Sequence, residues 1–244
     1  MNAVPRGKRV WRHALMEARL VLRNGEQLLL ALAIPLGLVV AHAAVGQQVG
    51  IPREPFIASV IGLGMWSTSF TSLAILTAFE RRYGVLERLV ATPLRRADLL
   101  LGKALAMTML ALGQAVVLVV AGLLTGWSPR PSAGQAAVVV LVVPLALLAF
   151  SGLALALAGT ASAEVTLGLA NLVYLVGAAG GLLLPAANFP AWAQPWLGLL
   201  PTTALGESLR TWATGGFDPL PVAVVAVWVV AALALARKVF RWTS

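Results

Sequence analysis

Residues 80–103 read ERRYGVLERLVATPLRRADLLLGK, a charged stretch inside a chain that is otherwise strongly apolar. Of the 244 residues, 59% are hydrophobic and only 11% are charged. A soluble fold of this composition would leave a large apolar area in water, so the composition predicts an integral membrane protein. The charge in this one stretch then needs an explanation.

Apolar runs long enough to cross a bilayer core lie on both sides of the charged stretch. The sequence predicts an all-α membrane protein, one domain over residues 1–244, with six transmembrane helices at 28–47, 56–79, 99–124, 135–158, 165–184 and 219–237. Basic residues gather before the first run, in the charged stretch and after the last run. By the positive-inside rule we expect both termini and the charged stretch to be cytoplasmic, in a multi-pass protein of the cytoplasmic (plasma) membrane.

Residues 8–24 show the 3.6-residue period of an amphipathic helix. One face carries Trp11, Leu15, Ala18 and Leu22, and an adjoining face carries Lys8, Arg12, Arg19 and Arg23. This pattern predicts a helix in the inner interface, with the apolar face in the acyl boundary and the arginines at the headgroups. A short unstructured basic tail is the alternative. A cleavable signal peptide, imitated by Ala41-His42-Ala43, fits less well because the charged leader is long.

Residues 185–219 form the connection before the last run, on the predicted outer side, and prolines and tryptophans interrupt them. They predict two short helices, about 191–199 and 203–214, that re-enter or lie along the outer leaflet. For the second helix we expect Thr202 or Thr203 as N-cap, a Glu207 and Arg210 pair, and a stop at Gly215-Gly216. A large extracellular loop is the alternative.

Several function classes lack the residues that they require. The basic residues lie between apolar runs, not on a surface with stacking aromatics, so nucleic acid is not an expected partner. Gly102-Lys103 lacks the upstream glycine of a phosphate-binding loop, and the chain has no cysteine and only two histidines. We therefore expect no ATPase motif, no metal and no bound cofactor. Ser59 and Ser151 leave an intramembrane serine protease formally possible, although serine in a membrane helix is usually a packing residue.

Residues 80–98 predict more than a solvated loop. Glu80 ends the second predicted span, and an amphipathic helix is expected to run to Ala91, with apolar contacts from Val85, Leu86, Leu89 and Val90. Thr92-Pro93 indicates a helix restart with threonine as N-cap. Neither Glu80 nor Glu87 has a basic partner at helical spacing, so both are free to pair outside this helix. A solvated loop explains the arginines equally well, but not the amphipathic pattern between them.

A family resemblance rests on Glu80-Arg81-Arg82, Gly84, Leu86-Glu87, Leu89, Thr92-Pro93-Leu94 and Gly102-Lys103. These residues resemble the signature of ABC-2 type permeases, and the six runs extend the resemblance loosely over the whole chain. It implies that residues 80–98 form a cytoplasmic coupling segment seated on a separate ABC ATPase subunit, which binds ATP and Mg. The coupling residues would be Glu80, Arg81, Arg82, Gly84, Glu87, Arg88, Thr92 and Pro93.

The same resemblance implies a transporter of two permeases, identical or paralogous, and two ATPase subunits. Small-residue faces at Gly177 and Gly181, and at Ala154 and Ala158, suit a dimer interface or packing within one subunit. Such a transporter would work as an exporter, for example in multidrug efflux or in lipid or glycoconjugate export.

Polar side chains inside the predicted spans are the candidates for a substrate pathway, namely Ser67, Thr68, Thr71, Asn171 and Tyr174, with Gln114 as a further one. No charged residue lies near the centre of any span, which favours an amphipathic or lipid-like substrate. Hydrogen bonding between helices, or to the residues' own backbone, is an equally weighted alternative.

A second function class stays open. Haem-handling membrane components of cytochrome c maturation resemble the same family and assemble without exporting. The tryptophans of residues 185–219 are compatible with that role, although tryptophans at an interface are ordinary membrane anchors. A neighbouring ATPase reading frame would favour an exporter, and neighbouring haem-lyase frames would favour maturation.

Overall fold

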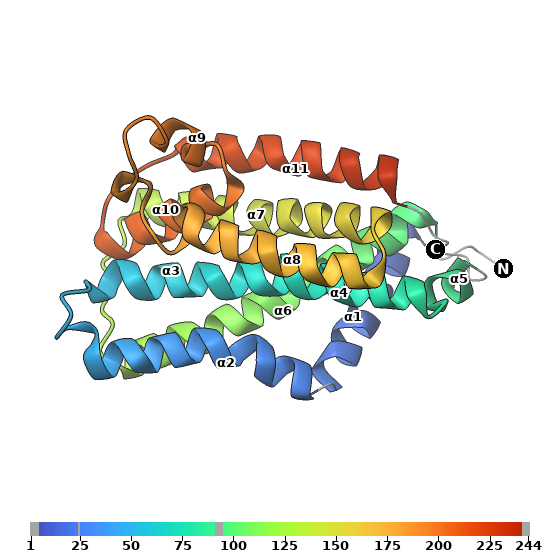
Figure 1. Ribbon diagram of the computed structural model, residues 1–244, viewed down its shortest axis with the longest axis horizontal. Coiled ribbons are helices and arrows are strands. Elements are labelled where there is room, and N and C mark those ends of the chain that lie inside the picture. Colours follow the sequence, from blue (N-terminus) through green and yellow to red (C-terminus); the bar gives the residue numbers. More distant parts are fainter. Residues whose placement is uncertain (1–4, 24, 91–94, 241–244) are drawn as a thin grey trace.

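The apolar runs of the sequence form long helices that lie side by side in one bundle (Figure 1). The structure, a computed structural model, describes residues 5–23, 25–90 and 95–240, without the side chains of 25–30, 88–90 and 96. Every regular element within these ranges is a helix or a helical turn. Both chain ends and α5 lie at one end of the bundle, called here the α5 end, and α10 lies toward the opposite end, called the α10 end (Figure 1).

The helices follow one another in a simple order. Their bounds are α1 Arg6–Arg23, α2 Gly25–Ala41, α3 Arg53–Trp66, α4 Leu73–Arg82, α5 Val85–Val90, α6 Arg96–Leu124, α7 Ala133–Thr160, α8 Ala163–Gly177, α9 Gln194–Gly198, α10 Pro201–Thr214 and α11 Leu220–Val239. Three π-helical turns, η1 His42–Gly46, η2 Ser67–Ser72 and η3 Ala178–Leu182, extend α2, join α3 to α4 and extend α8, and η4 Ala186–Asn188 is a short 3-10 turn. The α3–η2–α4 unit is therefore one continuous rod.

Among the described residues, five helices are long and apolar enough to cross a membrane: Arg53–Arg82, Ala97–Leu124, Ala133–Thr160, Ala163–Leu182 and Leu220–Val239. They match the predicted spans from 56–79 onward. The first predicted span, 28–47, coincides with α2 and η1, whose described apolar part, Ala31–Gly46, is shorter. A sixth span there stays a prediction.

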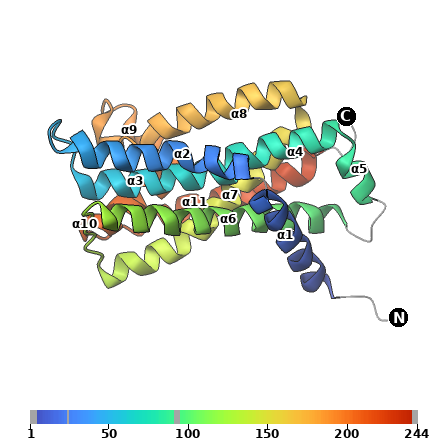
Figure 2. The same cartoon turned by 90° about the horizontal axis from the view of Figure 1, so that it is seen from below.

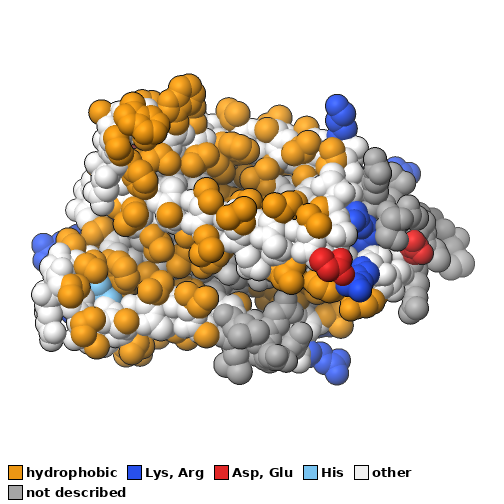
Figure 3. Space-filling view, viewed as in Figure 1, with side chains coloured by type: hydrophobic (Ala, Val, Ile, Leu, Met, Phe, Trp, Pro, Cys, Tyr) orange, Lys and Arg blue, Asp and Glu red, His pale blue; other side chains and the backbone are white. Residues whose placement is uncertain are grey.

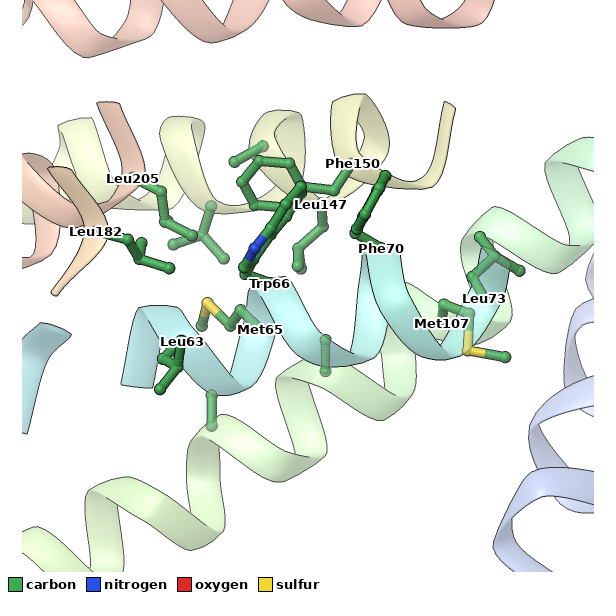
Figure 4. Close-up of a cluster of buried hydrophobic side chains, with 14 of the residues drawn as sticks. Leu63, Met65, Trp66, Phe70, Leu73, Met107, Leu147, Phe150, Leu182 and Leu205 are labelled. Atoms are coloured by element: carbon green, nitrogen blue, oxygen red, sulfur yellow. The ribbon is translucent and has the colours of Figure 1, made fainter. Parts of the chain in front are cut away.

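The core is centred on Trp66, at the end of α3, whose side chain is 2% exposed. Its ring stacks on Phe70 at 4.3 Å between centroids and meets the edge of Phe150 of α7 at 4.6 Å (Figure 4). Aromatic pairs in these geometries contribute about 0.5–1.5 kcal/mol beyond the area that they bury. The α3–η2–α4 rod is accordingly the most buried of the candidate spans.

Small residues let the other helices approach this core. A Cβ on Gly177 would lie 3.0 Å from Trp66 Nε1, and Gly181 has a φ of +95° that favours glycine. Ala154 and Ala158 are also fully buried within the chain. For these two small-residue faces the alternative of packing within one subunit holds.

The segment before the last span contains the two short helices that the sequence predicts, as α9 and α10. The predicted N-cap of α10 was wrong: the cap is Leu200, and Pro201 occupies the first helical position. Proline there is pre-organised for a helix, so the helix starts before the threonines, and the Thr203 hydroxyl instead donates to the Gly180 carbonyl at 3.0 Å. Gly215, with a φ of +86°, ends α10 as predicted.

Most of α10 is buried, and it packs on α3, α7, η3 and α11. It is thus part of the bundle and not a loop over its surface. That α10 re-enters the membrane or lies along its outer leaflet stays a prediction.

Helix α1 confirms the helix predicted for residues 8–24, and it packs against the first turns of α6 (Figure 2). Its four predicted basic residues are exposed, and so are Trp11 and Leu22 of the predicted apolar face. Its buried face carries Val10, Ala14 and Val21 together with His13 and Glu17. The helix therefore has two apolar sides, one against α6 and one facing outward.

The surface shown in Figure 3 agrees with a membrane protein. Hydrophobic side chains cover the length of the bundle, and charged side chains gather mostly at the α5 end. A belt of this kind suits an apolar solvent along the bundle and water at its ends.

Candidate functional site

Helix α4 continues through Glu80 to Arg82, and a turn at Tyr83 and Gly84 leads into α5. Gly84 has a φ of +68°, a left-handed conformation that glycine adopts without steric cost. The helix predicted from Glu80 to Ala91 is thus divided in two by this turn. Helix α6 begins at Arg96 with Arg95 as its N-cap. The helix restart predicted at Thr92 and Pro93 lies outside the described residues.

The three charged residues that end α4 are all held by other parts of the chain. The Glu80 carboxylate lies 2.6 Å from Lys103 Nζ of α6. The Arg81 guanidinium donates to the carbonyl of Ala161, and Arg82 forms an ion pair with Glu164 at the start of α8. The end of α4 is therefore tied to α6 and to the α7–α8 connection.

The turn and α5 present a surface to solvent. Tyr83 is 65% exposed and Val85 is 39% exposed, and Glu87 is exposed as well. Leu86 between them is fully buried and anchors α5 to the bundle. We call Tyr83, Val85 and Glu87 the α5 surface. The side chain of Arg88, another predicted coupling residue, lies outside the described part.

Behind this surface lies the Lys103 cluster, which consists of Lys103, Glu80, Glu17 and His13. Lys103 is fully buried, and its ammonium lies 2.9 Å from Glu17 Oε2 of α1 as well as 2.6 Å from Glu80. Glu17 Oε1 lies 3.5 Å from His13 Nε2. A buried ammonium needs carboxylate partners, and here they come from two other helices.

His13 and Gly102 fit together in this cluster. A Cβ on Gly102 would lie 2.3 Å from His13 Cδ2, so only glycine lets the imidazole pack against α6. Burial lowers the pKa of His13 below its usual value; nearby Glu17 raises it and Lys103 lowers it further. The ring is therefore neutral at neutral pH.

A second ion pair fastens the start of α1 to the start of α6. Asp98 is fully buried, and its carboxylate lies 2.7 Å from Arg6 Nε and 3.2 Å from an Arg9 nitrogen. Together with the Lys103 cluster, this places α1, α4 and α6 in one charged network.

Sequence reasoning singled out Glu80 and the Gly102-Lys103 pair but not Glu17, His13 or Asp98. One signal was available. A lysine inside an apolar helix needs an acidic partner, and few acids occur in the chain. Which acids lie nearby depends on how α1 packs, which the local pattern does not determine.

The candidate pathway residues fall into separate places. Thr68 donates to Gln114 Oε1 of α6, and Gln114 donates to the carbonyl of Ala31 at 2.9 Å. These groups lie in and beside η2, the polar π-helical segment between α3 and α4. π-helical turns of this kind are frequent at functional sites. Thr71 is buried, and its hydroxyl has no hydrogen-bond partner among the described residues. Ser67, the first residue of η2, is partly buried.

The two candidates of α8 do not join them. The Asn171 side chain is exposed and donates to its own helix, to the carbonyl of Leu167, at 2.9 Å. Tyr174 is partly buried, and its backbone carbonyl accepts a hydrogen bond from Trp66 Nε1 at 3.3 Å. For Asn171 the alternative of bonding to its own backbone holds.

Across residues 5–23, 25–90 and 95–240, no group of three or more His, Cys, Asp or Glu residues lies close enough together to hold a metal ion.

Comparisons with known proteins bear on this arrangement. No curated protein matches the chain. The family model described as ABC-2 family transporter protein matches residues 46–236, from the end of η1 through most of α11, and so includes α5 and the α4–α6 part of the charged network. Since the match covers most of the sequence, the chain belongs to the ABC-2 family of transporter proteins.

Proposed function

We propose that this chain is the membrane permease subunit of an ABC exporter driven by a separate ATPase subunit. The observation that carries the proposal is the α5 surface, an exposed element fixed between two candidate spans. Membership of a family of membrane transporter components supports it. The ATPase would dock on Tyr83, Val85 and Glu87, and it would carry ATP and Mg.

The contacts at the end of α4 support a route by which movement of the ATPase would reach the candidate spans. Movement of α5 would displace the end of α4, and the Glu80–Lys103 ion pair would transmit this displacement to α6. Arg81 and Arg82 would pass it to the α7–α8 connection through Ala161 and Glu164. The charged coupling residues whose side chains are described thus fall into two groups. Glu87 is exposed on α5, whereas Glu80, Arg81 and Arg82 bond to other parts of the chain. A rigid-body step of this kind would switch access between the two sides of the membrane.

The proposed cargo is an amphipathic or lipid-like molecule, such as a drug, a lipid or a glycoconjugate, moved outward. Its support is the scarcity of charge along the bundle, where the buried polar groups are mainly hydroxyls, with the amides of Gln114 and Gln135. A second permease, identical or paralogous, would complete the pathway. The outward-facing apolar residues of α8, such as Leu172 and Val176, suit such a partner. Both termini and α5 would lie on the cytoplasmic side of the plasma membrane.

A charge reversal tests the docking surface. In Glu87→Arg we expect co-purification with the ABC ATPase encoded in the same genome neighbourhood to be lost, together with lipid- or drug-stimulated ATP hydrolysis. Glu87 is exposed and has no ion pair among the described residues, so folding should be unchanged. The matched control is Glu54→Arg, in the first turn of α3 at the opposite end of the bundle. A Glu87→Arg variant that binds and stimulates its ATPase normally would refute the proposed surface.

Cross-linking gives an independent test, because the chain contains no cysteine. A single cysteine at Tyr83 or Glu87, labelled with a photoreactive maleimide, should cross-link to the ATPase. A cysteine at Glu54 should not. Equal cross-linking from both ends would contradict the proposal.

A further inference from the structure

A cavity of about 590 Å³ lies between α1, α2, η2 and α6. It falls in the size range of about 300–1,000 Å³ that is typical of ligand sites. Figures 1 and 2 show α1 and α2 meeting at an angle beside α6. The cavity is separate from the α5 surface and from the ion pairs of the Lys103 cluster.

The α1 side of the cavity is formed by one helical face. It carries Leu15, Ala18, Arg19 and Leu22, spaced as neighbours on one side of a helix, and Val21 beside them also lines the cavity. Three of these belong to the apolar face that the sequence predicts. The facing wall comes from α6, with Met107, Leu110 and Val117. The walls are therefore mostly hydrocarbon.

Three polar side chains, Thr68, Ser72 and Gln114, lie at the inner wall, and two of them are paired. Thr68 donates to Gln114, and Gln114 donates to the carbonyl of Ala31. Beside these paired groups only the partly exposed Ser72 hydroxyl adds polarity, so the interior suits an apolar ligand group.

Charge enters the cavity at one place. Arg19 is the single charged residue among the described lining residues; its side chain is exposed, and it forms no ion pair within the described part of the chain. Lys8, Arg12 and Arg23 of the same helix are exposed as well. The rim is thus positive and the interior apolar, a combination that fits an anion joined to a hydrocarbon chain.

We propose that this cavity binds an anionic phospholipid of the bilayer, with one acyl chain between α1, α2 and α6 and the phosphate at Arg19. A basic amphipathic helix at the headgroup level favours anionic lipid, and each basic residue near the surface contributes about 1 kcal/mol. A bound lipid would fill the space between α1 and α2 and hold α1 in place against α6. The site goes beyond the transport proposal, since it needs neither the ATPase nor a cargo.

Two variants separate the chain site from the headgroup site. Gly113 lines the cavity, and a Cβ there would meet no atom within 4 Å, so Gly113→Leu should fill the cavity without a clash. Its control is Gly168→Leu in α8, where a Cβ also meets open space. Arg19→Gln removes the rim charge. Its control is Arg12→Gln, an exposed arginine of α1 that does not line the cavity.

The measurement is native mass spectrometry of the full chain in detergent, titrated with dioleoylphosphatidylglycerol or with dioleoylphosphatidylcholine. The two probes differ only in the headgroup. We expect tighter binding of the anionic lipid, and Arg19→Gln should weaken that lipid alone by about fivefold, which corresponds to about 1 kcal/mol. Gly113→Leu should weaken the tightest-bound lipid by about tenfold or more whatever its headgroup.

The proposal would be overturned if Gly113→Leu bound lipid like the unchanged chain, or if Gly168→Leu lost as much. Equal losses in Arg19→Gln and Arg12→Gln would also overturn it, since they would indicate general surface attraction. Because the ATPase is absent from the assay, failure here leaves the ATPase co-purification result unaffected, and the two proposals can fail separately.

Discussion

Arg210 and Lys103 are buried cations at opposite ends of the bundle, and they are stabilised differently. At the α10 end, Arg210 donates to the carbonyls of Gly181 at 2.7 Å and Leu182 at 2.5 Å and to the Ser59 hydroxyl at 2.9 Å. Its one carboxylate partner, Glu207, is in its own helix at 2.8 Å. At the α5 end, Lys103 bonds only to carboxylates, from α1 and α4.

This difference has a mechanical meaning. Arg210 donates to two main-chain carbonyls of η3, where Gly181 departs from helical geometry, and so it ties α10 to the backbone of that turn. Lys103 is a compact charge on a flexible stem that links side chains of separate helices, and such pairs can reorganise as the helices shift. We therefore call Arg210 with its partners the anchor, because it holds main-chain groups in place, and we call the Lys103 cluster the joint, because its ion pairs can reorganise.

The largest expected effect is the loss of the anchor. Arg210→Met leaves two carbonyls, a hydroxyl and the Glu207 carboxylate without their buried donor, which should lower the free energy of unfolding by about 3–5 kcal/mol. Thermal unfolding in detergent would measure it. Arg130→Met, an exposed arginine at the same end, is the control and should change stability by no more than about 0.5 kcal/mol. A loss no larger than that of the control would mean that the α10 end is not anchored by this residue.

Loss of the joint should cost less. In Lys103→Met the carboxylates of Glu17 and Glu80 lose their cation, but Glu80 is 17% exposed and keeps contact with water, so we expect a loss of about 2 kcal/mol. Adding Glu17→Gln and Glu80→Gln should recover most of the stability, since the unpaired charge is then removed. Lys103→Met as damaging as Arg210→Met, without recovery in the triple variant, would erase the distinction between the two ends.

The two cations also show which features could be predicted from the sequence and which could not. Five spans, α1 and the two helices before α11 followed from hydropathy, period and helix stops, which are local properties. The partners of the cations did not, since Lys103 and Glu17 are 86 positions apart and Arg210 and Ser59 are 151 apart. Glu207 was predicted because i,i+3 neighbours are fixed by the helix alone.

The candidate site divides in the same way. The exposed Glu87 fits its lack of a basic partner at helical spacing, a property of neighbouring residues. The turn at Gly84 was not predicted, because the amphipathic pattern was interpreted as one helix running through it. That Glu80, Arg81 and Arg82 bond to other parts of the chain depends on where α6 and the α7–α8 connection lie. The N-cap of α10 was a competition between two local signals, threonine capping and proline at the first helical position, and proline prevailed.

A smaller effect tests how closely α1 must approach the joint. Gly102→Ala places a methyl group 2.3 Å from His13 Cδ2, and overpacking of this kind costs about 1–3 kcal/mol. In a His13→Ala background the same change should cost nothing measurable. Gly113→Ala in the same helix, with open space around its Cβ, is the control and should not destabilise. Additive effects of His13→Ala and Gly102→Ala in the unfolding assay would contradict the contact.

The smallest effect is on pH dependence and concerns the joint alone. The pKa of His13 is lowered in the folded chain, mainly by burial, so the unfolded chain takes up a proton more readily. Stability should therefore be unaffected above the usual value of 6.5, fall as the pH drops below it, and stop falling below the lowered value. Thermal unfolding of the unchanged chain and of His13→Gln over this range isolates the contribution, because all other titrating groups are shared. The variant should lose less stability on acidification. An equal loss in both proteins would show that protonation of His13 does not contribute to the fall in stability.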